Sequence, residues 1–124
     1  MLDLIIKNGK CYIDGELKDV DVAIKDKKIH KIGQISEDAK EIIDASNHTV
    51  LPGCIDTQTH FREPGSTDTE DLHSGSRAAI VGGITSVFEM PNTNPPTSNK
   101  KEFQRKLDLA KNRMYCNYAF YFGA

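Results

Sequence analysis

The first fifty residues alternate short apolar stretches with turn-forming pairs, which predicts a succession of short strands. The turn signals are Asn8-Gly9, Asp14-Gly15 and Asp26-Lys27-Lys28. Strands are expected near residues 4–6, 10–13, 19–24, 29–32, 41–45 and 48–51. A sheet this small usually needs further strands to close its core. Residues 1–52 are therefore predicted to form an N-terminal β-sandwich segment or small open barrel.

After residue 52 the pattern changes to strands that alternate with helices. The strands are expected over 54–60, 84–89 and 115–122. Strands joined through helices predict an α/β fold with a parallel sheet, either doubly wound or a (β/α)8 barrel. A barrel needs roughly 200 residues, so residues 53–124 would supply only its first βαβαβ portion, truncated and with open strand edges. Open edges and uncovered apolar surface favour self-association.

The two helices have separate signals. Thr67-Asp68-Thr69-Glu70 fits a capping box, which predicts that the first helix begins there, and Gly82-Gly83 is expected to end it. The second helix is expected from about Asn99, because one apolar stripe follows at spacings of four, three and four residues. The stripe consists of Phe103, Leu107, Ala110 and Met114.

Composition narrows the class of protein without giving its function. The 124 residues are 38% hydrophobic and 27% charged, with a formal net charge of -2, as in ordinary soluble domains. That charge gives no reason to expect a nucleic acid or a membrane surface as partner, and no apolar run is long enough to span a bilayer. The three cysteines lack metal-binding spacing and are expected to be reduced thiols of a cytoplasmic protein.

The segment 52–65 contains the strongest candidate chemistry. In a strand, alternate side chains share a face, so one set of polar residues is expected to project together at the C-terminal end of a barrel strand, where active sites form. This set is Asp56, Gln58, His60 and Arg62, while Thr57, Thr59 and Phe61 take the other face. Taken alone, a single histidine such as His60 is more often a structural hydrogen-bonding residue.

A second polar residue follows the next strand. Asn92 lies in a loop stiffened by Pro91, Pro95 and Pro96, at the C-terminal end of the strand over 84–89. An amide held there can orient a carboxylate or a carbonyl. The alternative is an asparagine that only braces its own turn, and spacing alone slightly favours that alternative.

Read together, these segments resemble the dihydroorotase branch of the amidohydrolase superfamily, closest to its long-chain bacterial type. The first-strand motif PG-hydrophobic-IDxHxHxREPG is matched here by PGCIDTQTHFREPG. The family segments GSRAA, GG-[IF]-T and MPNTxPP correspond to GSRAA, GGIT and MPNTNPP in this chain. The opening strands up to VLPG also resemble the family, so the resemblance covers essentially the whole chain.

The resemblance implies an N-terminal β-sandwich segment followed by an incomplete (β/α)8 metal-dependent hydrolase barrel. The intact protein would interconvert N-carbamoyl-aspartate and dihydroorotate in de novo pyrimidine biosynthesis. His60 would be a zinc ligand, and Arg62 and Asn92 would hold the substrate carboxylate. Gln58 stands where the first ligand histidine is expected, and an amide oxygen is a poorer zinc ligand, so one or two ions remain open. The other ligands and the proton shuttle would lie beyond Ala124, which leaves this stretch inactive alone.

Two alternatives remain. One is an allantoinase or hydantoinase-type cyclic amidase, which shares the sandwich, the GGIT strand and the metal-binding strand. Arg62 and the sequence Met90-Pro91-Asn92-Thr93 argue against it, because those relatives usually lack this carboxylate-binding pair. The other is a non-catalytic subunit that scaffolds aspartate transcarbamoylase, a reading that Gln58 keeps open. A homo-oligomer is expected for the intact protein.

Overall fold

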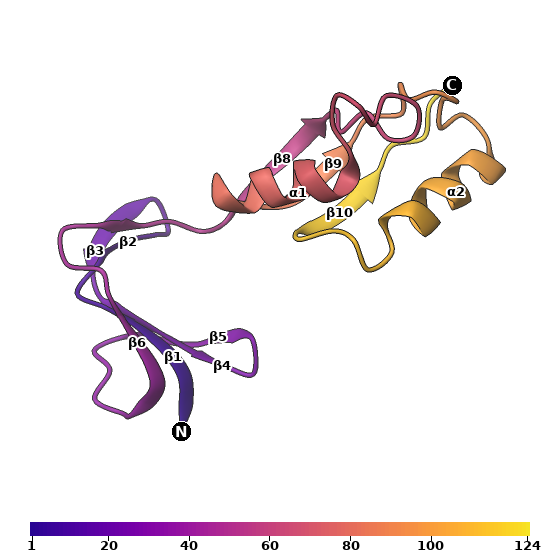
Figure 1. Ribbon diagram of the computed structural model, residues 1–124. Helices are drawn as coiled ribbons and strands as arrows, with labels where there is room; N and C mark the ends of the chain where they lie inside the picture. Colours follow the sequence, from indigo (N-terminus) through magenta and orange to yellow (C-terminus); the bar gives the residue numbers. More distant parts are fainter. The chain divides into compact units, whose positions relative to one another are not determined.

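The first part of the chain consists of strands in the computed structural model, which describes all of residues 1–124 (Figure 1). Residues Met1–Pro52 form one unit and Gly53–Ala124 form a second. The strands of the first unit are β1 (Leu2–Lys7), β2 (Lys10–Ile13), β3 (Glu16–Asp19), β4 (Asp21–Lys25), β5 (Lys28–Gly33), β6 (Ala39–Asp44) and β7 (Thr49–Val50).

These strands form two sheets, with the orders β5-β4-β1-β6 and β3-β2-β7. In the larger sheet β1 lies between β4, which is antiparallel to it, and β6, which is parallel. The buried residues of that sheet's core are Leu2, Ile5, Ala23 and Ile35. Six predicted strands are therefore confirmed, although β3 was missed and the strand expected from residue 19 begins at Asp21. The sequence also did not indicate how the strands divide between two sheets.

The turn signals of this unit have different outcomes. Asp14 and Gly15 take positive φ angles of 52° and 86° between β2 and β3, and Asp26 and Lys27 take 51° and 62° between β4 and β5. Two consecutive positive φ angles favour a tight hairpin, so these turns are confirmed. Asn8 also turns, with φ of 64°. It does not pair β1 with β2, however, because both neighbours of β1 are other strands.

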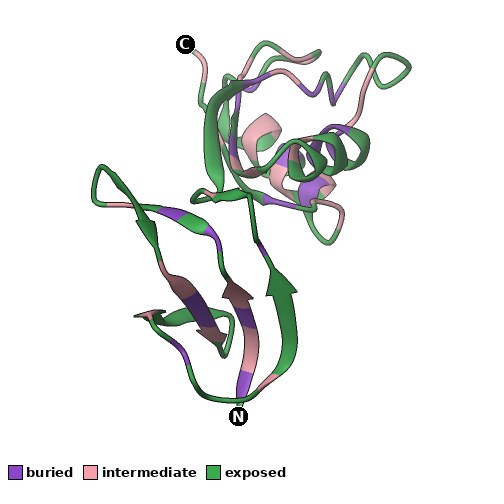
Figure 2. Cartoon of the chain, turned by 90° about the vertical axis from the view of Figure 1, so that its left-hand side faces the viewer, coloured by how far each residue is buried: buried purple, intermediate pink, exposed green.

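The second unit is a three-stranded parallel sheet with two helices. Its elements are β8 (Cys54–Thr59), α1 (Leu72–Val81), β9 (Ile84–Glu89), α2 (Lys100–Ala110) and β10 (Asn117–Phe120). The strand order is β10-β9-β8, and both pairings are parallel. Both helices lie on one face of this sheet (Figures 1 and 2). The core between them contains Phe61, Leu72, Val87, Ala110 and Cys116. The predicted βαβαβ order is confirmed, as the opening part of a barrel.

The start of α1 corrects the sequence-based expectation. The capping box is formed by Asp71 and Ser74, not by Thr67 and Glu70. The Ser74 amide donates to Asp71 Oδ1 at 2.7 Å, and the Asp71 amide donates to Ser74 Oγ at 3.1 Å. The helix begins at Leu72 because that side chain is fully buried and its amide donates to the buried Glu63 carboxylate at 2.9 Å. The predicted end at Gly82 is confirmed.

Replacing Asp71 with alanine is expected to reduce the free energy of unfolding by about 1 kcal/mol, the usual effect of losing an N-cap. Asp71→Asn is the matched control, because asparagine caps as well. The Ser74 amide lowers the pKa of the Asp71 carboxyl, so the charge contributes stability above the ordinary aspartate range and loses it as the pH falls through the lowered pKa. Urea unfolding at neutral and acidic pH should show the difference from alanine shrinking in acid.

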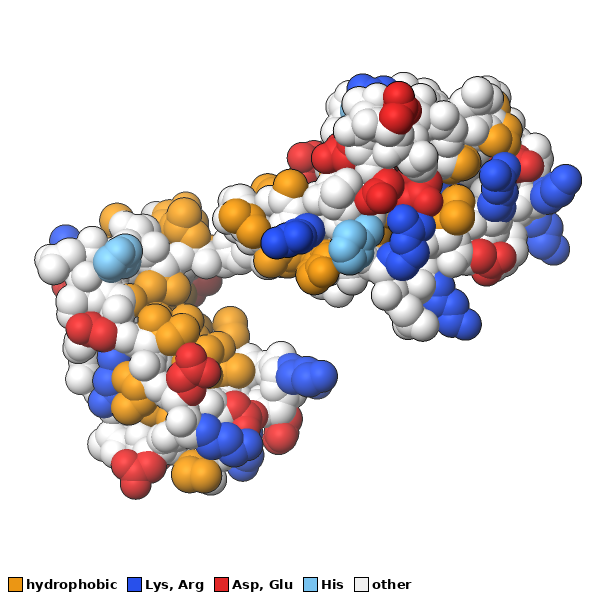
Figure 3. Space-filling model, in the orientation of Figure 1, with side chains coloured by type: hydrophobic (Ala, Val, Ile, Leu, Met, Phe, Trp, Pro, Cys, Tyr) orange, Lys and Arg blue, Asp and Glu red, His pale blue; other side chains and the backbone are white.

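Large apolar side chains stay exposed on both units (Figure 3). Among them are Ile29, Ile42, Leu51, Ile55, Val81 and Phe122. The expectation of exposed apolar surface is thus confirmed, while self-association stays a prediction. Neither helix is long and apolar enough to cross a membrane.

Candidate functional site

The structure brings His60 and Asn92 together. His60 directly follows β8 and is half-buried, and Asn92 follows β9, the neighbouring strand. His60 Nδ1 lies 2.9 Å from Asn92 Oδ1. Because an amide oxygen only accepts hydrogen bonds, Nδ1 carries the proton in this contact. Asn92 therefore does more than brace its own turn.

This contact leaves the other ring nitrogen of His60 suited to a metal ion. In a neutral imidazole protonated at Nδ1, Nε2 holds the free electron pair. Metal-binding histidines characteristically donate their second N–H to an oxygen that fixes the tautomer and ring orientation. His60 thus fits the chemistry of a metal ligand. No group of three or more His, Cys, Asp or Glu residues is close enough together to hold a metal ion.

Gln58 is exposed on β8, and its backbone amide donates to Asp56 Oδ1 at 2.9 Å. The register of β8 against β9 shifts between Asp56 and Thr59, so three steps on β8 match two on β9. Thr59 and Phe61 are buried toward the helices, as expected for the second face, whereas Thr57 is exposed. Buried and less buried side chains therefore alternate only from Thr59 onward, and not along the whole segment.

Arg62 is exposed between two buried residues, Phe61 and Glu63. Its φ of 63° lies in the left-handed region, which a non-glycine residue adopts at some cost. Glu63 is held by the bidentate guanidinium of Arg113 at 2.8 and 3.1 Å and by the amide of Leu72. These contacts fix the backbone on one side of Arg62.

A buried pair of opposite charges was missed by the sequence reasoning. The side chains of Glu89, at the end of β9, and Lys106, in α2, are 1% and 0% exposed. Their Oε1 and Nζ atoms lie 3.6 Å apart. Burial is the largest influence on both groups, raising the pKa of the Glu89 carboxyl and lowering that of the Lys106 ammonium. The sequence does contain a feature that could have indicated this pair, because each residue is charged where an apolar residue is expected. Glu89 is the last residue of the strand sequence ITSVFE, and Lys106 lies between Phe103 and Ala110 on the apolar stripe of the second helix.

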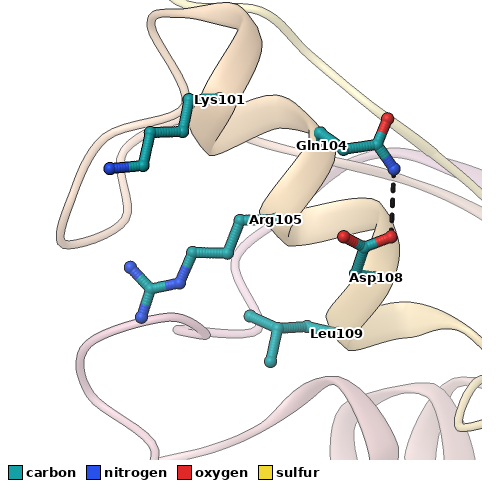
Figure 4. A pocket seen from close by; sticks show the side chains of 5 residues that line it. All are labelled: Lys101, Gln104, Arg105, Asp108 and Leu109. Carbon is teal, nitrogen blue, oxygen red and sulfur yellow. Dashed lines mark hydrogen bonds between the residues drawn. The ribbon is translucent and has the colours of Figure 1, made fainter.

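A shallow depression on α2 lies elsewhere (Figure 4). It is lined by Lys101, Gln104, Arg105, Asp108 and Leu109. Gln104 Nε2 donates to Asp108 Oδ1 at 3.0 Å, one turn along the helix. None of these residues contributes to the contacts of His60 or Asn92.

Residues 49–124 match the model of the amidohydrolase family, and the chain belongs to that family. Its members are generally metal-dependent. The superfamily-level resemblance read from the sequence is therefore confirmed.

Several proteins that are similar to this chain are named as cyclic amidases. The chain is 46% identical over 113 residues to an allantoinase of Escherichia coli O1:K1. This match covers 90% of the present chain and 25% of the allantoinase. The L-hydantoinase (dihydropyrimidinase) from Arthrobacter aurescens matches with a TM-score of 0.89 and 31% identity, covering 99% of this chain and 28% of that one. A D-hydantoinase from Thermus sp. matches with a TM-score of 0.81 and 30% identity, over 98% and 27% of the two chains. The chain thus spans about a quarter of the length of the curated relatives it matches.

Proposed function

We propose that these residues form the N-terminal part of a metal-dependent hydrolase that opens the ring of a cyclic ureide by cleaving an amide C–N bond. The observation that carries the proposal is the 2.9 Å contact between His60 Nδ1 and Asn92 Oδ1, which presents Nε2 at the C-terminal end of the first barrel strand. Membership in the amidohydrolase family supports the same chemistry.

In this proposal His60 holds a metal ion, taken as zinc, through Nε2, and further ligands come from other parts of the protein. The ion would polarise the scissile carbonyl and lower the pKa of a water molecule. Asn92 keeps the imidazole in the tautomer that can bind the ion. Arg62 lies two residues after His60 and is exposed, and in this proposal its guanidinium binds an anionic substituent of the substrate bidentately.

Allantoin is the first candidate substrate, because the E. coli proteins that match over 113 residues are named allantoinases. Dihydroorotate is the second, and Arg62 favours it, since this substrate has a ring carboxylate that a guanidinium can bind. The exposed position and left-handed backbone of Arg62 also suggest a function, because strained residues cluster at binding sites. A scaffold for aspartate transcarbamoylase stays the non-catalytic alternative.

Steady-state hydrolysis by the full-length, zinc-loaded protein separates these readings. Faster turnover of allantoin or hydantoin than of dihydroorotate would support the allantoinase type. Preference for dihydroorotate would establish the second candidate. No turnover of any of the three, together with co-purification of aspartate transcarbamoylase, would instead support the scaffold.

Arg62→Ala tests the role of the guanidinium if dihydroorotate is turned over. Loss of a charge-assisted hydrogen bond is expected to cost about 1.5–3 kcal/mol of binding, roughly a 10- to 150-fold rise in KM. Arg77→Ala, an exposed arginine on α1, serves as the control for loss of a positive charge. An unchanged KM in Arg62→Ala would remove this residue from the substrate site.

A further inference from the structure

The residues on both sides of His60 are held by one buried carboxylate. Both oxygens of Glu89 lie 3.0 Å from the backbone amide of Phe61, which donates to them. Oε2 also accepts the hydroxyl of Thr59 at 2.9 Å. Thr59 and Phe61 are buried and immediately precede and follow His60. Glu89 therefore fixes the backbone from which the His60 side chain projects.

Lys106, the partner of Glu89 in the buried pair, holds the end of β9 that leads to Asn92. Lys106 Nζ donates to the backbone carbonyl of Met90 at 2.9 Å, and Met90 lies two residues before Asn92. The ammonium also lies 5.2 Å from the ring centroid of Phe120 in β10, a distance typical of a cation–π contact. Lys106 thus joins α2 to the ends of two barrel strands.

Stability alone gives a poor reason for this pair. Removing two charges from water costs about as much as their attraction returns, and well-packed apolar replacements are often neutral or stabilising. The pair is nevertheless fully buried, and no buried side-chain N or O atom of the chain lacks a hydrogen-bond partner. What the polar pair provides, and apolar residues would not, is directional bonds to the backbone at Phe61 and Met90.

We propose that Glu89 and Lys106 are positioning residues that hold His60 and Asn92 in register, so that the imidazole meets a metal ion in one fixed orientation. The inference rests on the proposed function, since it requires His60 to bind a metal. Neither residue touches the ion or the substrate. Their effect passes through the backbone at Thr59, Phe61 and Met90.

The test compares zinc affinity with stability in the full-length protein. The double variant Glu89→Met with Lys106→Met fills the same space without charges. Zinc affinity, measured by competition with a chromophoric chelator, is expected to weaken about 10- to 100-fold, as when partners of metal ligands are lost. The thermal unfolding midpoint of the metal-free double variant should fall less than that of Lys106→Met alone, because no unpaired charge remains, although the Phe61 amide and the Met90 carbonyl lose their partners. Gln104→Met, at an exposed position of α2, is the control and should bind zinc like the unaltered protein.

Unchanged zinc affinity in a folded double variant would overturn the inference while leaving the proposed function intact. Absence of zinc binding by the unaltered protein would overturn the proposed function itself. Thr59→Val covers the case in which the double variant fails to fold, because it keeps both charges and removes only the hydroxyl, which bonds to Glu89 at 2.9 Å and to the Phe88 carbonyl at 3.3 Å. It should weaken zinc binding by a smaller factor, and an affinity equal to that of the unaltered protein would again count against the inference.

Discussion

Replacing Lys106 alone with methionine is expected to lower the free energy of unfolding by about 3–5 kcal/mol, because it leaves a buried carboxylate without its partner. The Glu89 side chain is 1% exposed, so water cannot replace the lost ammonium. The Met90 carbonyl also loses its 2.9 Å donor. Urea denaturation of the full-length protein measures this loss, provided that the second unit unfolds in one transition.

The loss should depend on pH in a defined direction. Burial raises the pKa of the Glu89 carboxyl in the folded protein above its ordinary value, and removal of Lys106 raises it further. A raised pKa disfavours folding: the penalty develops as the pH rises from the ordinary glutamate pKa toward the raised folded pKa, and it is constant above that value. The destabilisation of Lys106→Met should therefore shrink in acid. The double methionine variant is the control, because it has no carboxylate to neutralise, and an equal loss at every pH would contradict this explanation.

His60→Ala is expected to abolish zinc-dependent ring opening, with a loss of activity on the order of a thousandfold or more if the ion supplies several kcal/mol of transition-state stabilisation. The variant should still fold, because His60 is only half-buried and its one side-chain hydrogen bond is with the exposed Asn92. Activity and bound zinc, counted by elemental analysis, are the measurements.

His48→Ala is the matched control, since His48 is exposed and bonds only to the nearby carbonyl of Ser46 at 2.9 Å. It should retain both zinc and activity. Full activity in His60→Ala would overturn the metal assignment, and with it the reading of Asn92 as the residue that fixes the imidazole.

Local signals explain what the sequence could predict of the fold. The hairpins at Asp14-Gly15 and at Asp26-Lys27 follow from residues that tolerate positive φ. The second helix begins after Asn99, whose side chain caps it by accepting the Glu102 amide at 3.0 Å. Such features depend on neighbours in the chain, which a sequence displays directly.

Features set by distant residues were not predictable in this way. The first residue of α1 depends on the Glu63 carboxylate, nine positions earlier. The contact between His60 and Asn92 spans 32 positions, although placing both at adjacent strand ends was possible from the βαβ order. Glu89 and Lys106 went unnoticed because charged residues are assumed to face solvent. A charge inside an otherwise apolar stripe is the sequence feature that should prompt a search for its partner.

The order of strand pairing has a consequence for how the protein is made on the ribosome. In the second unit each strand pairs with the next one along the chain, β8 with β9 and β9 with β10. These three strands can therefore pair one after another as the chain emerges. In the first unit β1 pairs with β6, which joins Leu2 to Ala39. One edge of β1 must therefore stay open until β6 has been synthesised.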